Sequence, residues 1–116
     1  RLIRKLCTHC RSLTKISDAM HSWAAQLDDQ LELPKQLYTA TGCDKCFATG
    51  YKGRTGIFEL LLMKPNLKQL VAKQHTSAQI SVQAKCNGMT SLARNGIAAA
   101  ASGITSLAEV IRVCDV

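Results

Sequence analysis

The sequence predicts an α+β fold in which helices outweigh strands. Two C-x2-C pairs lie in the first half of the chain, while helix-capping residues and helically spaced apolar residues fill the second half. Aromatic residues make up only 4% of the 116 residues, so the core must come from aliphatic side chains, which suit short helices better than a β-sandwich. We therefore expect a small tetracysteine subdomain over residues 1–56 and a helical subdomain over residues 57–116.

One helix and one strand are predicted in the first half. Ser17 is a suitable N-cap for a helix that reaches about Gln30, and Pro34 ends that segment. The helix has apolar residues at positions i, i+3, i+4, i+7 and i+11, namely Met20, Trp23, Ala24, Leu27 and Leu31. Residues 37–40, LYTA, have the composition of a short strand that leads into the second cysteine pair.

The second half begins with an apolar run, IFELLLM at residues 57–63. This run is typical of a buried strand, although its pattern also fits the start of a helix. Asn66 is the expected cap of a helix that carries Leu67, Leu70 and Val71, and a second short helix is expected after Ser77.

Two further helices complete the predicted order of elements. One covers residues 91–101 and stops at Gly103, a residue type that favours the position after a helix end. The last helix begins at Thr105 or Ser106, because Ser106 and Glu109 fit the S-x-x-E capping box.

The two C-x2-C pairs predict a metal site. Each pair places two sulfur atoms on one side of a tight turn, and two such turns complete a tetrahedron of thiolates around Zn²⁺. We therefore predict Cys7, Cys10, Cys43 and Cys46 as zinc ligands. The predicted helix lies between the pairs, so the metal would clamp a helical insertion at its base. Four protein ligands leave no position for a reacting water, which makes the site structural and not catalytic.

Other interpretations of the cysteines and of one histidine stay open. Disulfides or reduced buried thiols are the alternatives to zinc, and the doubled spacing in a chain without a secretory signature favours the metal. His9, inside the first pair, is an alternative ligand, although we expect it to be exposed on the turn. Cys86 and Cys114 lie outside the pattern and are expected to be small buried or half-buried residues.

The segment GYKGRTG, residues 50–56, has glycine at every third position. It predicts either a connecting turn with solvated Lys52 and Arg54, or a backbone-exposed turn that contacts an anion. Arg54 is the better candidate for that contact, because a guanidinium binds phosphate or carboxylate through two hydrogen bonds. The sequence contains no G-x-x-x-x-G-K-[ST], so it has no Walker A loop.

The formal charge of +7 raises the question of an anionic partner. A four-thiolate zinc site carries a formal charge of −2, so we expect part of the basic charge to balance the metal. The basic residues near the cysteines are Arg4, Lys5, Arg11, Lys45, Lys52 and Arg54. The alternative is a freestanding basic zinc-ribbon module that binds nucleic acid. With only Phe47 and Tyr51 available for stacking near the glycine-rich segment, no nucleic-acid partner is expected.

The first residue is Arg1 and not methionine, and RLIRKLC lacks the length and cleavage site of a secretory signal. We expect the chain to be a piece of a longer protein. No apolar run approaches the roughly 18 residues of a transmembrane helix.

Five ordered segments resemble a known family. RLIRKLCTHC, YTATGCDKC, GYKGRTGIFELL, GMTSLARNGI and GITSLAEVIRV are similar to the C-terminal portion of the type II secretion and type IV pilus assembly ATPases, the GspE/PilB group. Retraction ATPases of the PilT type lack the tetracysteine insertion, so the resemblance favours the secretion and assembly branch. The sequence departs from the family pattern at Thr8, Asn95 and Cys114. Thr8 does not affect metal binding, and Asn95 argues against the need for a charge at its position.

The resemblance implies a parent protein with a RecA-like ATPase core upstream of this chain. That parent would be a cytoplasmic homohexamer, peripheral to the bacterial inner membrane, that uses ATP and Mg²⁺ to drive protein export or pilin polymerisation. Its partners would be an inner-membrane platform and cytoplasmic adaptor proteins. By resemblance the four paired cysteines match zinc ligands, and Arg54 matches an arginine close to the nucleotide. Without Walker A and Walker B the chain is expected to be inactive alone, and no catalytic residue is predicted in it.

Overall fold

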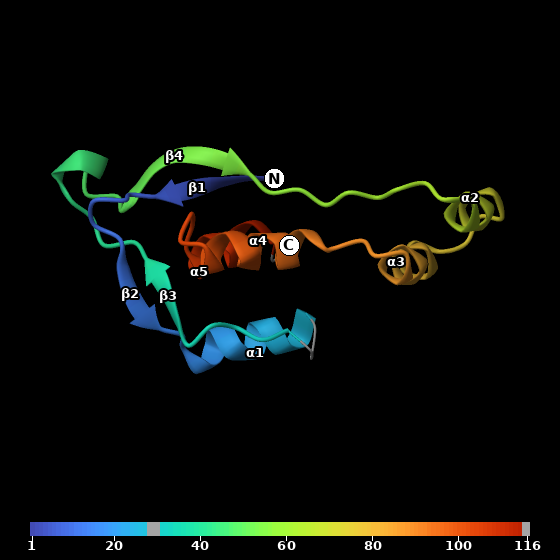
Figure 1. Cartoon of the computed structure of the whole chain (residues 1–116), viewed down its shortest axis with the longest axis horizontal. Helices are drawn as coiled ribbons and strands as arrows, with labels where there is room; N and C mark the ends of the chain where they lie inside the picture. The colour runs from blue at the N-terminus through green and yellow to red at the C-terminus, as the bar shows by residue number, and fades with distance from the viewer. Residues whose placement is uncertain (28–30, 115–116) are drawn as a thin grey trace. The chain divides into compact units, whose positions relative to one another are not determined.

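The computed structural model describes residues 1–27 and 31–114 (Figure 1). The described part contains five α-helices, a 3-10 helix and four short strands, and helices hold more residues than strands, as predicted. In chain order the elements are β1 (Leu2–Leu6), β2 (Ser12–Lys15), α1 (Asp18–Leu27), β3 (Gln36–Thr39), η1 (Asp44–Cys46), β4 (Tyr51–Gly56), α2 (Pro65–Ala72), α3 (Ser77–Cys86), α4 (Leu92–Ala101) and α5 (Leu107–Cys114).

The chain forms two compact units. Arg1–Ile57 and Leu92–Val116 make up the first unit, and Phe58–Ser91 make up the second. This division differs from a single boundary at residue 56, because α4 and α5 pack against β1 and β3 and so join the N-terminal segment. The other two helices of the C-terminal half, α2 and α3, form the second unit with each other.

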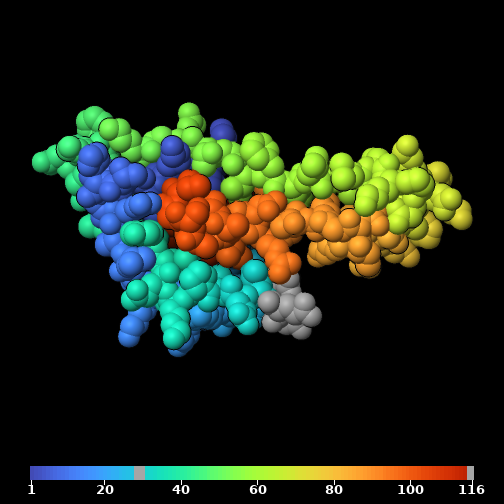
Figure 2. Space-filling model, in the orientation of Figure 1, coloured from blue at the N-terminus to red at the C-terminus, as the bar shows by residue number. Residues whose placement is uncertain are grey.

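The first unit is built on two antiparallel strand pairs. β1 pairs with β4, with Arg4 opposite Arg54, and β2 pairs with β3, with Ser12 opposite Thr39. We call these pairs the β1–β4 arm and the β2–β3 arm. The helices α4 and α5, orange to red, lie between the two arms in the ribbon and in the space-filling view (Figures 1 and 2).

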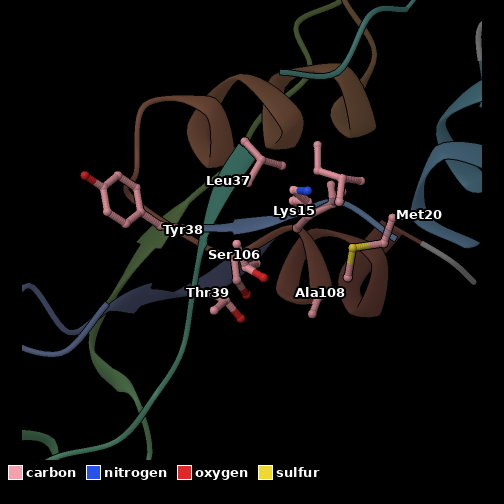
Figure 3. Close-up of a pocket in the computed structure, with 10 residues that line it drawn as sticks. Lys15, Met20, Leu37, Tyr38, Thr39, Ser106 and Ala108 are labelled. Atoms are coloured by element: carbon pink, nitrogen blue, oxygen red, sulfur yellow. The ribbon is translucent and has the colours of Figure 1, made fainter. Parts of the chain in front are cut away.

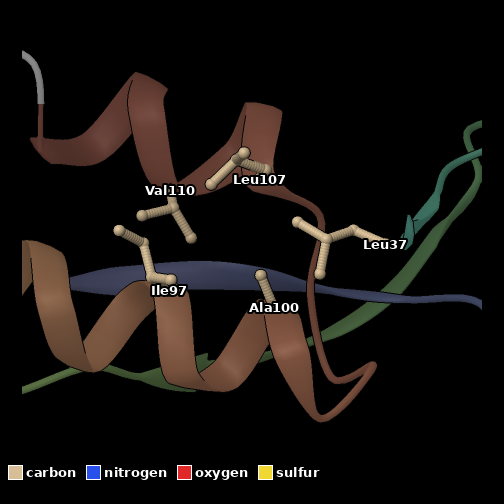
Figure 4. Close-up of a cluster of buried hydrophobic side chains, with 5 residues drawn as sticks. All are labelled: Leu37, Ile97, Ala100, Leu107 and Val110. Carbon is tan, nitrogen blue, oxygen red and sulfur yellow. The ribbon is translucent and has the colours of Figure 1, made fainter. Parts of the chain in front are cut away.

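A cluster of buried aliphatic side chains joins α4 and α5 to the β2–β3 arm. Its members are Leu37, Ile97, Ala100, Leu107 and Val110 (Figure 4). Met20 and Trp23 of α1 pack against this cluster, so the helix between the cysteine pairs belongs to the same core. Gly96 lets the two helices approach closely, because a Cβ at this position would lie 2.7 Å from Cγ1 of Val110.

A second cluster joins α5 to the β1–β4 arm. It consists of Ile3, Ile57 and Val113, all of them buried. Since Val110 and Val113 lie on the same helix but in different clusters, α5 contributes apolar side chains to both arms at once.

The predicted helix and strand of the first half are present. Ser17 caps α1 as expected, with its hydroxyl accepting a hydrogen bond from the amide of Met20 at 3.3 Å. The predicted end of this helix, at residues 28–30, lies outside the described residues. The strand expected at residues 37–40 is β3, one residue earlier in the chain.

Two predictions about the middle of the chain are wrong. Most of the glycine-rich segment, expected to be a turn, is strand β4, because its backbone pairs with β1. The apolar run at residues 57–63 forms neither strand nor helix, and only Ile57 is buried. The large apolar side chains that follow, from Phe58 to Met63, are exposed. An apolar composition was therefore not enough to predict whether these side chains are buried.

The second unit consists of α2 and α3. Asn66 was expected to cap α2, but the helix begins at Pro65 after the N-cap Lys64. The Asn66 side chain instead exchanges two hydrogen bonds with Asn87, at 2.9 and 3.0 Å, and so ties the two helices together. The cap of α3 is Thr76, which forms a capping box with Gln79.

Candidate metal centre

The two cysteine pairs lie where the arms of the first unit meet. Cys7 follows β1 and Cys10 precedes β2, while Cys43 follows β3 and Cys46 ends η1 just before β4. Each pair therefore connects a strand of one arm to a strand of the other, and the arms diverge from this point around α4 and α5 (Figure 1). The structure brings together the four residues that the spacing selected.

The sulfur atoms have the spacing of a tetrahedral thiolate site. All four lie within 4.8 Å of one another, and the pairs Cys7–Cys43, Cys10–Cys46 and Cys43–Cys46 are 3.8, 3.8 and 3.7 Å apart. A tetrahedron with metal–sulfur bonds of about 2.3 Å has edges of about 3.8 Å. The four Sγ atoms can therefore hold one metal ion without rearrangement of the turns, which fits Zn²⁺ by distance and by donor type.

Backbone amides surround the sulfurs and favour negative charge there. Cys10 accepts a hydrogen bond from the amide of Gly42 at 3.3 Å, and Cys46 accepts bonds from the amides of Cys43 and Gly50 at 3.3 and 3.2 Å. Burial disfavours the Cys46 thiolate, but these amides and the neighbouring thiols outweigh it and lower its pKa to about 6. Burial and the neighbouring thiols raise the pKa of Cys43 to about 11. A metal must therefore displace protons from some of the thiols.

Gly50 connects the two cysteine turns. Its carbonyl accepts a 2.9 Å hydrogen bond from the amide of Cys7, in addition to the bond that its own amide donates to Cys46. Its φ of +81° favours glycine, and a Cβ there would lie 2.5 Å from the Cβ of Ala40. The glycine-rich segment thus has a direct structural role at the metal centre.

Two of the arginines expected to balance a metal centre have other partners. Arg11 donates a 2.6 Å hydrogen bond to the carbonyl of Gly103, and its guanidinium lies 4.4 Å from the centroid of the Tyr38 ring. Arg4 stacks on Tyr51 at 4.1 Å and binds Glu109. Much of the compensation at the sulfurs therefore comes from amides, and these two arginines join the arms to the helices.

The sequence predicted Glu109 as a capping residue but did not reveal its ion pair with Arg4. Ser106 caps α5 as predicted, since its hydroxyl accepts a 3.1 Å hydrogen bond from the amide of Glu109. The carboxylate, only 1% exposed, binds Arg4 at 2.9 Å and Arg112 at 2.6 Å. The Arg112 bond and the Arg4 bond overcome the effect of burial and lower the pKa of Glu109 to about 2. The Glu109–Arg112 spacing was a usable signal, but Arg4 lies 105 positions away.

Arg54 lies on β4 at a solvent-open hollow of about 270 Å³. Arg4, Thr49, Tyr51 and Gly53 form the rest of the lining. At this hollow the Arg4 guanidinium binds Glu109 and the Thr49 and Tyr51 hydroxyls bond within the chain, so Arg54 is the group that can meet an anion.

A second cavity, of about 30 Å³, lies between the β2–β3 arm, α1 and the start of α5. Met20, Leu37, Tyr38 and Ala108 are among the residues around it (Figure 3). Small-molecule sites usually measure about 300 to 1,000 Å³, so this cavity is a packing gap and not a substrate site.

The remaining residues discussed from the sequence are not members of the cysteine cluster. His9 is exposed on the first turn, as expected. Cys114 is half-buried, as expected, whereas Cys86 is exposed, so its predicted burial is wrong. None of the helices in the described part of the chain has the length and apolar character needed to span a bilayer.

Comparisons with known proteins agree with the resemblance. The family model described as type II/IV secretion system protein matches residues 1–112. The type IV pilus assembly ATPase TfpB of Acinetobacter baylyi is 42% identical over 97% of this chain, and PilB of Pseudomonas aeruginosa is 38% identical over 97%. The type II secretion system ATPase E of Vibrio cholerae is 39% identical over 97%.

The matches cover only part of each relative. The chain spans 19% of TfpB, 20% of PilB and 22% of ATPase E, about a fifth of their length. The matched part runs along nearly the whole of this chain, and the range of the family model contains the positions of all four clustered cysteines. The chain belongs to the type II/IV secretion system protein family.

Proposed function

We propose that Cys7, Cys10, Cys43 and Cys46 hold a structural Zn²⁺ that fixes the two arms of the first unit around α4 and α5. The observation that carries this proposal is the 3.7 to 3.8 Å spacing of the sulfurs, which matches the edge of a zinc–thiolate tetrahedron. With four protein ligands the ion supplies structure and binds no reacting water.

Metal analysis of the purified chain tests this assignment. We expect one zinc per chain, and we expect Cys43→Ser to lose most of it because three thiolates bind less tightly. Cys86→Ser is the matched control, since Cys86 is exposed and outside the cluster. A zinc content well below one per chain, or equal loss in both variants, would contradict the proposal.

For the whole protein we propose a hexameric ATPase of type II secretion or type IV pilus assembly. Relatives that match almost the whole of this chain are named as ATPases of these two systems. The chain would be the C-terminal region of that protein, with ATP and Mg²⁺ bound by a RecA-like core outside it. Its zinc-binding unit would transmit movements of the core to an inner-membrane platform and to cytoplasmic adaptor proteins. Those movements would drive protein export or pilin polymerisation.

Within this role we propose that Arg54 contacts the nucleotide of the parent protein. Its support is an exposed position in a basic hollow with Arg4, Thr49 and Tyr51. A hydrogen bond to a charged group contributes about 1.5 to 3 kcal/mol, so Arg54→Ala in the parent should raise the KM for ATP at least about tenfold.

The control for this experiment is Lys52→Ala, which removes an exposed positive charge from the same strand. Both variants should keep their zinc, because neither residue is a ligand. An unchanged KM in Arg54→Ala, or the same change in both variants, would count against a nucleotide contact while leaving the zinc site intact.

A further inference from the structure

The second cysteine turn presents a phenylalanine to solvent in a backbone conformation that this residue rarely adopts. Phe47 has φ 55° and ψ 40°, in the left-handed region. Its side chain is 92% exposed. A bulky residue at positive φ is uncommon and strained, so both its conformation and its exposure need an explanation.

The hydrogen bonds of the cysteine turn impose this conformation. The carbonyl of Cys43 accepts bonds from the amides of Cys46 at 3.3 Å and Ala48 at 2.8 Å, and the amide of Gly50 then returns to the Cys46 sulfur at 3.2 Å. To make these bonds the chain takes positive φ at both Phe47 and Ala48. Any residue at position 47 would adopt the same conformation, and glycine or asparagine would do so with less strain.

The phenyl ring contributes little to the packing of this chain. With 92% of Phe47 exposed, most of its apolar surface remains in water. The turn lies at the junction of the arms, beyond the ends of α4 and α5 (Figure 1). Folding therefore accounts for the turn but not for an aromatic side chain at its tip.

Exposed charged residues lie close to Phe47 in the sequence, and most of them are lysines. Lys45, two residues before it, and Lys52, at the start of β4, are exposed and form no ion pair within the described chain. Asp44 is exposed beside Lys45, so the tip also carries a carboxylate. A convex apolar tip flanked by free cations is complementary to a concave apolar pocket with acidic groups at its rim.

We propose that Phe47 anchors a protein–protein contact by inserting into an apolar pocket of a different protein, whose rim carboxylates face Lys45 and Lys52. A bilayer is the less suitable occupant, because one ring is a weak membrane anchor and the Asp44 carboxylate is unfavourable at an anionic surface. The proposal depends on the geometry of the cysteine turn and not on the ATPase assignment.

The first test is thermal unfolding of the zinc-loaded chain. Phe47→Asn should raise Tm by about 4 °C, because asparagine tolerates the left-handed region and no packing is lost. Ala48→Gly should raise Tm similarly while keeping the ring. A lower Tm in Phe47→Asn would mean that the ring stabilises the chain itself, and would overturn the proposal.

The second test identifies the partner. p-Benzoylphenylalanine replaces Phe47 in the full-length parent protein in its own cells, and the crosslinked peptides are sequenced after irradiation. We expect crosslinks to one other protein, at a segment that combines apolar and acidic residues. The control position is Leu13 of β2, which is 54% exposed but lies outside the cysteine turns and should not crosslink to that segment.

Binding to the purified partner completes the test. Phe47→Asn should weaken its Kd at least tenfold, and Ala48→Gly should leave it unchanged, with one zinc retained in both variants. Crosslinks to phospholipid alone, to further copies of the parent alone, or to nothing would overturn the proposal. None of these outcomes depends on whether the parent hydrolyses ATP, so the two proposals can fail separately.

Discussion

Replacing Glu109 by glutamine removes a buried negative charge and keeps the size of the side chain. In the native chain its carboxylate accepts hydrogen bonds from the backbone amide of Arg4 and from the guanidinium groups of Arg4 and Arg112. An amide can accept from one guanidinium group, but its own N–H₂ group then faces the other. The substitution therefore acts on the contact between β1 and α5.

The size of the effect follows from the pKa of Glu109. The folded chain lowers it from the usual 4.5 to about 2, and each unit corresponds to about 1.4 kcal/mol, which gives an upper value of roughly 3.5 kcal/mol. Arg4 and Arg112 are 47% and 58% exposed, so water can partly replace the lost carboxylate. We expect Glu109→Gln to lower the free energy of unfolding by about 2 kcal/mol at pH 7.

The pH dependence has a defined sign. Because the folded pKa of Glu109 is below its unfolded pKa, its contribution is complete above about pH 4.5 and disappears as the pH falls toward about 2. The difference between the native chain and Glu109→Gln should therefore be constant from pH 6 to pH 8, where metal-bound thiolates persist, and should narrow only in acid.

Trp23 gives a direct assay, since it is the single tryptophan and packs on the cluster that contains Val110 of α5. Urea unfolding of the zinc-loaded chain, followed by Trp23 fluorescence at pH 7, measures the free energy of unfolding. Glu32→Gln is the control, because Glu32 is exposed. If Glu109→Gln unfolds at the same urea concentration as the control, the carboxylate does not stabilise the unit and the reasoning is refuted.

Three further changes test the packing of the first unit. Gly96→Ala should lower the free energy of unfolding by about 1 kcal/mol, because the added Cβ would lie 2.7 Å from Val110 Cγ1. Helix propensity alone predicts that alanine stabilises the helix, so a higher urea midpoint in this variant would exclude the clash. Arg11→Lys should lower the free energy of unfolding by about 1 to 2 kcal/mol in the same assay, because it removes the bond to Gly103 and the stacking on Tyr38. An unchanged urea midpoint would contradict this. Removal of zinc by a chelator should unfold the unit, since thiolate sites contribute on the order of 10 kcal/mol, and a Trp23 spectrum unchanged after complete metal loss would disprove that dependence.

The features predicted correctly are those with local signals. A C-x2-C turn is defined within four residues, so two of them are enough to select Cys7, Cys10, Cys43 and Cys46. Two helix caps were equally local signals, because the hydroxyls of Ser17 and Ser106 accept bonds from helix amides as expected. The Asn66 cap was not, since Lys64 takes that position.

The features missed depend on partners that are distant in sequence. β4 is a strand only because β1 pairs with it, with Arg4 opposite Arg54, and its two glycines give no strand signal of their own. The apolar residues from Phe58 to Met63 were expected to be buried, but burial needs an opposing surface that composition cannot supply. The same holds for Arg4, whose charge was expected to help balance the metal site while its partner is a carboxylate of its own chain.

The position of the cysteines means that a metal held by them would act beyond their own turns. Every strand of the two arms ends or begins close to the cluster, so a bound ion would fix the angle at which the arms diverge. That angle is matched to α5, which buries Val110 toward one arm and Val113 toward the other and binds Arg4 through Glu109. Loss of a bound metal and loss of the Glu109 charge would therefore both weaken the packing of the two arms against α5. Their effects on stability should be less than additive where both are partial, since a looser arm no longer holds Arg4 against the carboxylate and that contact cannot be lost twice.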